Sequence, residues 1–478
     1  MTSATDFDEY DSYNLSQFSA EELALADPTT GSAELSSPSP YKLYRARRKV
    51  LSVSDLIGPL WCEVQFDYGL RQRRWQPLEE RPRSFLGANG QAIHVNHALA
   101  AENDHILKAG TVIHERLERE LRPETIQVQP ESELETWALR LIRIISCFAD
   151  LDTHGLCREM PTFGFMHGQL VSGTIDEVRK QAIPGSYRNR FHLLHITDTK
   201  SRTNSSLPSD KDAHPARMQL MIYHRLLTDI MSPSFSWPEL WSRVGLDPYA
   251  PLRHEFLQQS LHLLPGTYSE RLITGQGRDL QCTLDATVQA LQTTVKAVKV
   301  TSVAPMVKVV YCRQHALAPK SGPQYNAEQL QTIQAEIEIE LMKEDGALPE
   351  LARMIAVDAI KTRYPRAVTN TASDKPHDKN VNPRAFASSP VLQETSVSLS
   401  SQTAPDKGPD IIGVKEFYMD QELLDDHLDW ILAYWMGVRA PEGVPVENTW
   451  RCNRCEYKDG CEWRAAKARE IESQFGIP

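Results

Sequence analysis

Long apolar runs are missing from this sequence of 478 residues, and the longest are far shorter than the ~20 residues of a membrane-spanning helix. We therefore expect no membrane association. The phosphate-cradling pattern Gly-x4-Gly-Lys-Ser/Thr is also missing, so ATP dependence is not predicted. Residues 1–40 contain no Lys or Arg and no apolar core, unlike a mitochondrial presequence or a secretory signal. These absences favour a nuclear or cytoplasmic protein, with a mitochondrial location left open.

Most of the excess negative charge of the chain lies in its N-terminal segment. The net charge is −11, and residues 1–40 carry eight acidic side chains, so the remaining chain is close to neutral at −3. Basic clusters in that remainder could contact phosphate groups, although solvated surface charge explains such clusters equally well. The clusters comprise Lys42, Arg45, Arg47, Arg48 and Lys49, followed by Arg71, Arg73 and Arg74 beside Trp75.

Two polar segments interrupt the folded pattern. Residues 1–40 and 366–410 show little apolar periodicity, so we predict a disordered acidic tail and a disordered insertion. The folded domain then comprises residues 41–365 and 411–470. Its order of helix, two strands and helix predicts an α/β or α+β fold. We expect strands at 163–178 and 191–198, and helices at 105–122, 134–151, 214–230, 252–264, 284–297, 326–343, 349–362 and 419–437.

Two carboxylates and a lysine lie where the two expected strands end. Asp176 closes the run Gly-Thr-Ile-Asp, and Asp198 and Lys200 belong to Thr-Asp-Thr-Lys. If adjacent strands bring their ends together, the carboxylates converge, and Mg²⁺ prefers such oxygen ligands. The strand period of two places Asp198 and Lys200 on one face, where the lysine could orient an attacking water and stabilise charge on a phosphate. The cation would polarise the phosphate and lower the pKa of the water.

Three more polar side chains lie on the neighbouring expected helices. Gln219 and Tyr223 are four residues apart, so they face one way and could orient the lysine, the water or the phosphate. His114 could be a further metal ligand or a phosphate contact. Taken singly, each is better explained without a site, the Gln–Tyr pair as a helix surface, the histidine as structural and the Asp-x-Lys tripeptide as chance. Their order and spacing together favour a site.

These residues match a known set of motifs. The succession resembles the RecB-like branch of the PD-(D/E)xK nucleases in Gly110-x3-His114, Gly-x-Ile-Asp176, Asp198-x-Lys200 and Gln219-x3-Tyr223. The resemblance implies a restriction-endonuclease-like core, in which helices flank a mixed central sheet and the metal site lies at one edge. It also implies that the two aspartates bind Mg²⁺ or Mn²⁺ with His114 as a further ligand, that the lysine is catalytic, and that the Gln–Tyr pair completes the site. Many relatives have Glu where this chain has Asp198, which shortens the side chain but keeps the carboxylate.

The eight cysteines are scattered except for the last three. Cys62 lies 390 positions before the set Cys452-x2-Cys455-x5-Cys461. In a large chain without a secretion signal, this pattern favours metal-bound or buried thiols over disulfides. Four sulfurs at these spacings could hold an iron–sulfur cluster or a zinc ion, and the spacing does not distinguish them. The other four are predicted to be ordinary buried thiols, namely Cys147, Cys157, Cys282 and Cys312.

A second resemblance rests on the sequence around these cysteines. WCEVQFDYGL, which contains Cys62, and CNRCEYKDGCEWR, which contains the last three cysteines, are most similar to the exonuclease V family. The resemblance implies a [4Fe–4S] cluster held by these four cysteines, which staples the N- and C-terminal parts together. It also implies a Mg²⁺-dependent exonuclease that acts on single-stranded DNA, releases short oligonucleotides and serves DNA repair.

The same resemblance implies a monomer whose partner is single-stranded DNA, with a single-strand-binding protein as a further partner. Candidates for the lining of a DNA channel are Arg71, Arg73, Arg74 and Trp75, which the sequence does not place. The residues do not predict the polarity of digestion. The alternatives are a Cas4-like or structure-specific endonuclease, or a zinc-stapled DNA-binding protein whose nuclease site is inactive.

Overall fold

The computed structural model describes residues 38–122, 128–183, 192–264, 282–313, 335 and 410–475. Apart from residue 335, all of them belong to one of two units, which comprises residues 1–315 and 407–478. The expected helices at 326–343 and 349–362 lie outside the described residues, as do nearly all of the predicted tail and insertion. Among the described helices, none has the length and apolar character needed to cross a membrane.

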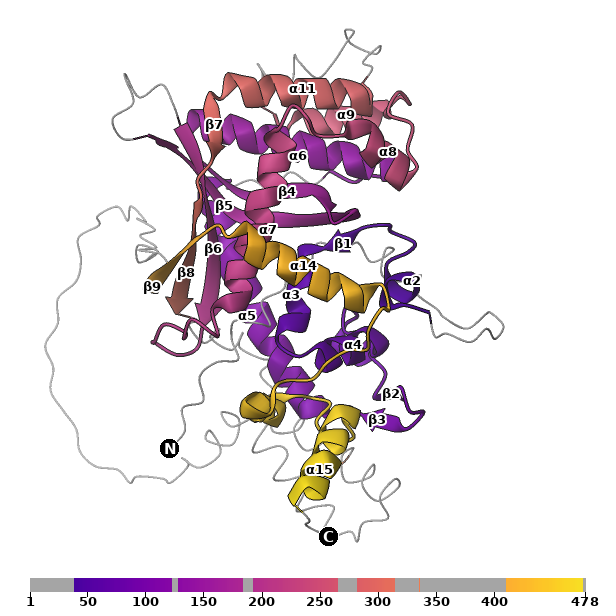
Figure 1. The fold of residues 1–478 in the computed structure, drawn as a ribbon. Helices are drawn as coiled ribbons and strands as arrows, with labels where there is room; N and C mark the ends of the chain where they lie inside the picture. The colour runs from indigo at the N-terminus through magenta and orange to yellow at the C-terminus, as the bar shows by residue number, and fades with distance from the viewer. Residues whose placement is uncertain are drawn as a thin grey trace, which may run out of the picture. The chain divides into compact units, whose positions relative to one another are not determined.

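A mixed sheet of seven strands forms the centre of this unit (Figure 1). Its main path runs β1-β5-β6-β8-β9, with β4 paired to β5 and β7 paired to β6. β5 pairs antiparallel with β4 and β6, whereas β6 and β8 run parallel. The predicted mixed central sheet is therefore confirmed. The strands are β1 (Leu51–Ser52), β4 (Leu156–Met166), β5 (Gln169–Ala182), β6 (His192–Arg202), β7 (Val300–Val303), β8 (Met306–Arg313) and β9 (Ile411–Tyr418).

Helices cover both faces of the sheet, as predicted. Along β4, Phe163 contacts Trp137 of α6 (Glu133–Thr153), whereas the next residue, Gly164, lies against Leu226 of α7 (His214–Met231). Successive strand residues point to opposite faces, so β4 is packed between these two helices. Further helices are α8 (Trp237–Val244), α9 (His254–Leu261), α11 (Leu284–Ala297), which packs on α6, and α14 (Gln421–Trp435).

The expected strand at 163–178 is wrong, because this stretch is a hairpin. β4 and β5 meet at a tight turn in which both His167 (φ 45°) and Gly168 (φ 76°) have left-handed backbone conformations. Gly168 adopts such a conformation without steric cost. The turn was not predicted because apolar residues continue on both sides of it, as they would in one continuous strand. Asp176 therefore lies within β5 rather than at a strand end, and Asp198 lies within β6.

The other boundaries agree closely with expectation. α7 and α11 match the helices predicted at 214–230 and 284–297, and α14 lies inside 419–437. α9 is shorter than predicted. The helix expected from residue 105 is α5 (His97–Leu121), which begins eight residues earlier because the Asn96 side chain accepts a hydrogen bond from the Leu99 amide and caps its start.

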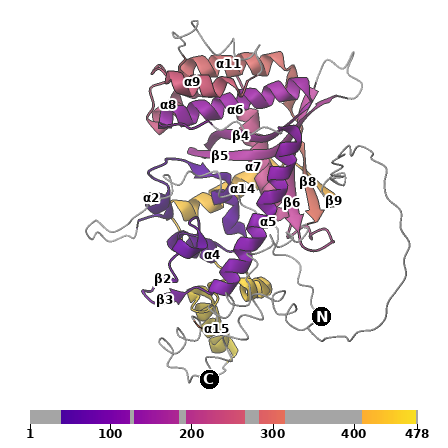
Figure 2. The same ribbon diagram turned by 180° about the vertical axis from the view of Figure 1, so that it is seen from behind.

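The C-terminal segment returns to the first part of the chain (Figure 1). Tyr457, which has no exposed surface, packs with Val64, Tyr68 and Ile93 in a small apolar cluster separate from the main core. This cluster joins α4 (Glu63–Arg71), the hairpin of β2 (Ser84–Leu86) and β3 (Ala92–His94), and the region before α15 (Glu462–Phe475). Figure 2 shows α5 running from the sheet towards this region.

Candidate functional site

Asp176 and Asp198 lie opposite each other on neighbouring strands. Glu177 of β5 pairs with Thr197 of β6, so the next position along the antiparallel pair brings the two aspartates together on one face. The Thr199 amide donates a hydrogen bond of 2.9 Å to Asp176 Oδ2, which fixes that carboxylate against β6. The predicted convergence is thus present, although it arises from mid-strand positions rather than strand ends.

Lys200 is buried beside these carboxylates. Its Nζ lies 3.0 Å from Asp198 Oδ2 and donates a hydrogen bond of 2.9 Å to Gln219 Oε1. Gln219 Nε2 in turn donates to the Tyr223 hydroxyl over 3.3 Å. Hydrogen bonds therefore connect the lysine on β6 to the glutamine and then to the tyrosine on α7. The glutamine and tyrosine lie on the same face of α7, as their spacing of four residues predicted.

Gly173 makes room for these hydrogen-bonded side chains. A Cβ atom at this position would lie 2.8 Å from the Tyr223 ring and 2.6 Å from Val53, which is closer than side chains tolerate. The absence of a side chain lets β5 approach α7 and α3 (Val53–Ile57) closely. The glycine of the Gly-Thr-Ile-Asp motif is therefore a packing requirement of the site.

His114 reaches the same place from α5. Its Nδ1 lies 3.5 Å from Asp176 Oδ2 and 3.8 Å from Glu159 Oε1. Ligand atoms of these three side chains all lie within 4.8 Å of one another, a spacing at which they could hold a metal ion. The structure thus brings together all the predicted nuclease-site residues and adds Glu159.

Glu159 was not identified from the sequence. Arg158 pairs with Glu177 and Met160 with Ile175, so Glu159 stands opposite Asp176 across β4 and β5. Its φ of 50° is a left-handed conformation that a glutamate rarely adopts. In the sequence, the one sign of a site here is that Glu159 lies between the apolar residues Cys157 and Met160, which are both fully buried in the structure. The sequence does not show the hairpin register that places Glu159 opposite Asp176.

Burial dominates the electrostatics of the carboxylates. Asp198 is 1% exposed, and burial raises its pKa to about 6, with Asp176 adding to the rise and Lys200 opposing it. Burial also raises the pKa of Glu159 to about 9, assisted by the negative charges of Asp176 and Glu118. Oδ2 of Asp198 pairs with the Lys200 ammonium at 3.0 Å, whereas its Oδ1 has no hydrogen-bond partner among the residues that the structure describes. A cation placed here would relieve the repulsion between the carboxylates and would give Oδ1 a partner.

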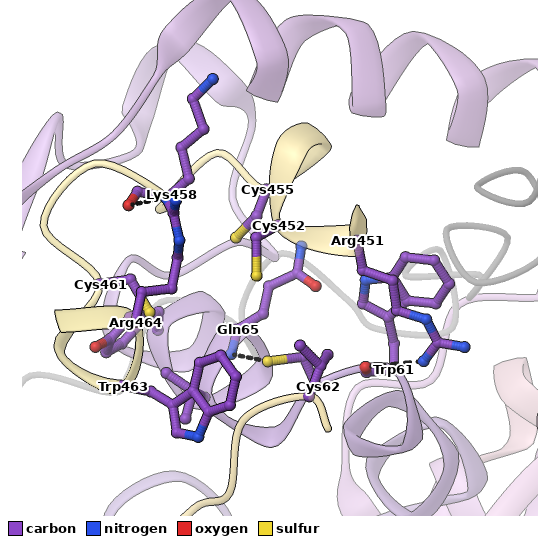
Figure 3. Close-up of a pocket in the computed structure, with 13 residues that line it drawn as sticks. Trp61, Cys62, Gln65, Arg451, Cys452, Cys455, Lys458, Cys461, Trp463 and Arg464 are labelled. Carbon is purple, nitrogen blue, oxygen red and sulfur yellow. Dashed lines mark hydrogen bonds between the residues drawn. The ribbon is translucent and has the colours of Figure 1, made fainter. Parts of the chain in front are cut away.

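The four cysteines predicted to act together line one pocket (Figure 3). Cys62 caps the start of α4, where its Sγ accepts a hydrogen bond from the Gln65 amide at 3.5 Å. Cys452, Cys455 and Cys461 approach it from the 3₁₀ helix η7 (Val446–Arg454) and the turn that follows. All four thiols are free, so the structure contains no disulfide among them.

The surroundings of these thiols combine burial with positive charge. Burial raises the pKa of Cys62 to about 11 and that of Cys455 well above its usual value. Arg451, Lys458 and Arg464 also line the pocket. Four sulfurs with neighbouring cations fit a metal centre, since bound metal deprotonates thiols and basic side chains offset the negative charge of four thiolates.

The guanidinium of Arg451 is held beside this pocket by two tryptophans. It lies 4.1 Å from the centre of the Trp61 ring and 5.7 Å from that of Trp450, and its Nη1 donates to the Trp61 carbonyl oxygen. Trp61 precedes Cys62, and Trp450 and Arg451 precede Cys452. Cation–π contacts thus fix the two cysteine-bearing segments against each other.

Several basic residues predicted as DNA contacts have structural partners. Arg45 pairs with the buried Asp55 at 2.6 Å, and Arg71 pairs with Asp67 at 2.7 Å. Arg74 lies 3.6 Å from Glu456. The prediction that this segment lines a DNA channel stays a prediction. Cys147, Cys157, Cys282 and Cys312 are buried, as expected.

The carboxylate site and the cysteine pocket both lie within the residues that one protein-family model matches. The sequence model described as "Exonuclease V - a 5′ deoxyribonuclease" matches residues 39–189 and 180–464, which is most of the chain. The chain belongs to the exonuclease V family. The exonuclease V match includes the four pocket cysteines as well as His114, Glu159 and the β5, β6 and α7 motifs.

A curated relative shows a more limited similarity. Exonuclease V of Danio rerio is 29% identical over 101 residues, which cover 18% of this chain and 25% of that protein. The match therefore spans about a quarter of the length of this exonuclease V relative.

Proposed function

We propose that this protein is a Mg²⁺-dependent deoxyribonuclease that digests single-stranded DNA from an end, releases short oligonucleotides and serves DNA repair. The observation that carries the proposal is the juxtaposition of Asp176, Asp198 and Lys200, in which a buried ammonium lies 3.0 Å from one of two facing carboxylates. The family description supports DNA as the substrate and the 5′ end as the starting point.

The chain's own residues have distinct roles in this proposal. Asp176 and Asp198 would hold Mg²⁺, which when bound supplies Lewis-acid polarisation of the scissile phosphate. Lys200, oriented by Gln219, places a positive charge where charge builds during phosphodiester hydrolysis. Tyr223 holds the glutamine amide, so that Gln219 presents its oxygen to the lysine. His114 completes the ligand set from α5.

The four pocket cysteines are proposed to hold a [4Fe–4S] cluster. Four free thiols around one pocket, drawn from positions 62 and 452–461, match the ligand number and chemistry of such a cluster. The cluster would link the start of α4 to the C-terminal segment. It would thereby close a loop that contains the residues between Cys62 and Cys452. Iron and sulfide analysis of anaerobically purified protein tests this assignment against zinc.

The nuclease proposal is tested by matched aspartate substitutions. Asp198→Asn removes a buried site carboxylate, whereas Asp152→Asn removes one from the exposed face of α6, where it pairs with Lys180. With end-labelled single-stranded DNA and Mg²⁺, we expect the wild type and the Asp152 variant to digest DNA and the Asp198 variant to be inactive. Equal activity of the two variants would refute the assigned site.

A further inference from the structure

Three consecutive charged residues lie in the loop that joins β6 to α7, outside every motif discussed above. Each of them is bonded to the C-terminal part of the chain. The pairs are Asp210 with Lys415 of β9 at 2.5 Å, Lys211 with Asn448 of η7 at 3.0 Å, and Asp212 with Arg451 of η7 at 3.6 Å. The loop is therefore bonded both to β9 and to the segment that contains Cys452.

Burial distinguishes Asp212 from the other acidic residue of this loop. The side chain of Asp212 is 12% exposed and that of Arg451 is 7% exposed, whereas the side chain of Asp210 is 94% exposed. Exposed ion pairs contribute little because solvent screens them, but a buried charge that loses its partner is costly. Of these two ion pairs, the one between Asp212 and Arg451 is therefore able to hold the loop in place.

Further contacts fix both members of this ion pair. The Arg451 guanidinium lies 4.1 Å from the centre of the Trp61 ring and donates a hydrogen bond of 3.2 Å to the Trp61 carbonyl oxygen. Asp212 Oδ2 accepts a hydrogen bond from the Ser209 hydroxyl, and the Asp212 amide donates to the same hydroxyl oxygen at 3.2 Å. The pair therefore avoids much of the side-chain entropy cost that weakens surface ion pairs.

The helix α7 begins directly after Asp212. Ala213 occupies the capping position, and an alanine there cannot provide the side-chain hydrogen bond that usually stabilises a helix start. The Ala213 amide donates to the Ser209 carbonyl oxygen at 2.9 Å, so the loop leads directly into the helix. The ion pair between Asp212 and Arg451 therefore lies where it can fix the start of a helix that has no side-chain cap.

The same helix carries Gln219, which contacts the proposed catalytic lysine. Gln219 lies five positions after His214, the first residue of α7. Its Oε1 accepts the hydrogen bond from Lys200 Nζ at 2.9 Å, and both residues are buried. A shift at the start of α7 would move this oxygen relative to the ammonium, and misplacement by about 1 Å can slow an enzymatic reaction about 10²-fold.

We propose that Asp212 is a positioning residue, which orients Lys200 by fixing the start of α7 against Arg451. The helix transmits this position to the oxygen of Gln219, which contacts the lysine directly. The inference rests on the proposed nuclease function, in which Lys200 places a positive charge where charge builds during hydrolysis. Asp212 itself is not expected to contact the DNA or the metal ion.

The kinetics of matched aspartate variants test this role in the full-length, anaerobically purified protein. Asp212→Asn keeps the size of the side chain but removes the charge beside Arg451, whereas Asp210→Asn removes an exposed charge two residues away. With single-stranded DNA and Mg²⁺, kcat of Asp212→Asn should fall about 10–10²-fold while its KM is unchanged, because the lysine loses its orientation and no DNA contact is removed. Asp210→Asn should match the wild type. Equal kcat values in the two variants, or a raised KM with unchanged kcat in Asp212→Asn, would overturn the proposal.

A double-mutant cycle determines whether Asp212 acts through Gln219. Gln219→Ala removes the oxygen that contacts Lys200, so adding Asp212→Asn to it should cause no further loss of kcat. A residue that only stabilises the fold would lower kcat by the same factor in both backgrounds, and that result would overturn the proposal.

A conservative variant tests the charge itself. Asp212→Glu keeps a negative charge within reach of Arg451 and should recover most of the rate that is lost in Asp212→Asn. A Glu variant that is as slow as the Asn variant would contradict a role for the ion pair.

Hydrogen exchange followed by mass spectrometry gives a readout that does not depend on catalysis. Residues 214–223 of α7 should exchange faster in Asp212→Asn than in the wild type, whereas residues 284–297 of α11 should exchange equally in both. Unchanged exchange in residues 214–223 would overturn the positioning role.

Digestion of single-stranded DNA by the wild type separates the two proposals. If exchange in α7 rises in Asp212→Asn but the wild type does not hydrolyse DNA, the nuclease proposal fails while the contact stands. If the wild type hydrolyses DNA and Asp212→Asn keeps wild-type exchange and kcat, the nuclease proposal stands and the positioning role fails.

Discussion

Asn103 of α5 donates a hydrogen bond of 3.0 Å from its side-chain Nδ2 to Oε2 of Glu456, the residue that follows Cys455. Glu456 is 1% exposed and also accepts from Gln65 of α4 at 3.3 Å. α5 carries His114 three turns further along. The cysteine pocket and the carboxylate site are therefore linked through one helix, which Figure 2 shows extending between the two regions.

This link predicts that Glu456→Ala weakens both regions. The change removes the buried acceptor of the Asn103 and Gln65 side-chain amides, which costs about 1–3 kcal/mol in the free energy of unfolding. Release of α5 should also weaken Mg²⁺ binding, because His114 loses its fixed position. Thermal unfolding and Mg²⁺ titration of activity measure the two effects. Glu456→Gln keeps an acceptor and should be milder in both, so a milder Ala variant would contradict the link.

Cys455→Ser is expected to lose the metal centre and destabilise the chain. Ligand loss removes metal-binding free energy that contributes to folding. The control is Cys312→Ser, which changes a buried thiol on β8 far in sequence from the pocket cysteines. Metal content and the unfolding temperature should both fall in the Cys455 variant, whereas the control should retain its metal. A Cys455 variant with wild-type metal content and stability would disprove a structural centre.

Lys200→Met should abolish cleavage while leaving DNA binding largely intact. The substitution keeps the length of the side chain but removes the charge beside Asp198, and loss of such a group typically slows reactions about 10²–10⁴-fold. Lys180→Met is the matched control, since that lysine lies on the same sheet but pairs with Asp152 outside the site. Cleavage rates and DNA affinity are measured for both variants. Parallel loss of binding and cleavage in Lys200→Met would argue against a catalytic role.

The raised pKa of Asp198 predicts how pH affects the metal-free protein. Because burial holds the folded-state pKa at about 6, the folded state binds a proton that the unfolded state has lost between about pH 4 and 6. This group's contribution to stability is therefore full below about pH 4 and is lost as pH rises through 6. Its size is on the order of 1–3 kcal/mol.

Asp198→Asn should remove this dependence. Without Mg²⁺, we expect the stability of the wild type relative to the variant to fall as pH rises from 4 to 7, because only the wild type must ionise a buried carboxyl group over this range. Denaturant unfolding at several pH values in chelator measures it. A wild type whose advantage over the variant grows between pH 4 and 7 would contradict the burial-raised pKa.

The sequence was sufficient to predict residues whose positions depend on local periodicity. Asp198 and Lys200 share a face because strands repeat every two residues, and Gln219 and Tyr223 share one because helices bring positions four apart together. The last three cysteines lie close together in the sequence, at a spacing that suits a metal centre. These inferences needed no knowledge of how distant segments pair, whereas Cys62, 390 positions earlier, was assigned to the same centre through the resemblance to exonuclease V.

The position of Glu159 at the site could not be predicted from the sequence. Its place opposite Asp176 depends on the register of the β4–β5 hairpin, which is set by the tight turn at His167 and Gly168. The apolar residues that flank this turn resembled one continuous strand, so the register was hidden. The link from Asn103 to Glu456 joins positions 353 apart, and only tertiary packing brings them together.

The most direct test of the central claim compares linear and circular single-stranded DNA of the same sequence, incubated with the protein and Mg²⁺. An exonuclease acting at the Asp176–Asp198 site should degrade the linear strand to short oligonucleotides and leave the circle intact, and Asp176→Asn should degrade neither. Cleavage of the circle at a rate equal to that of the linear strand, or undiminished digestion by the Asp176 variant, would contradict the account.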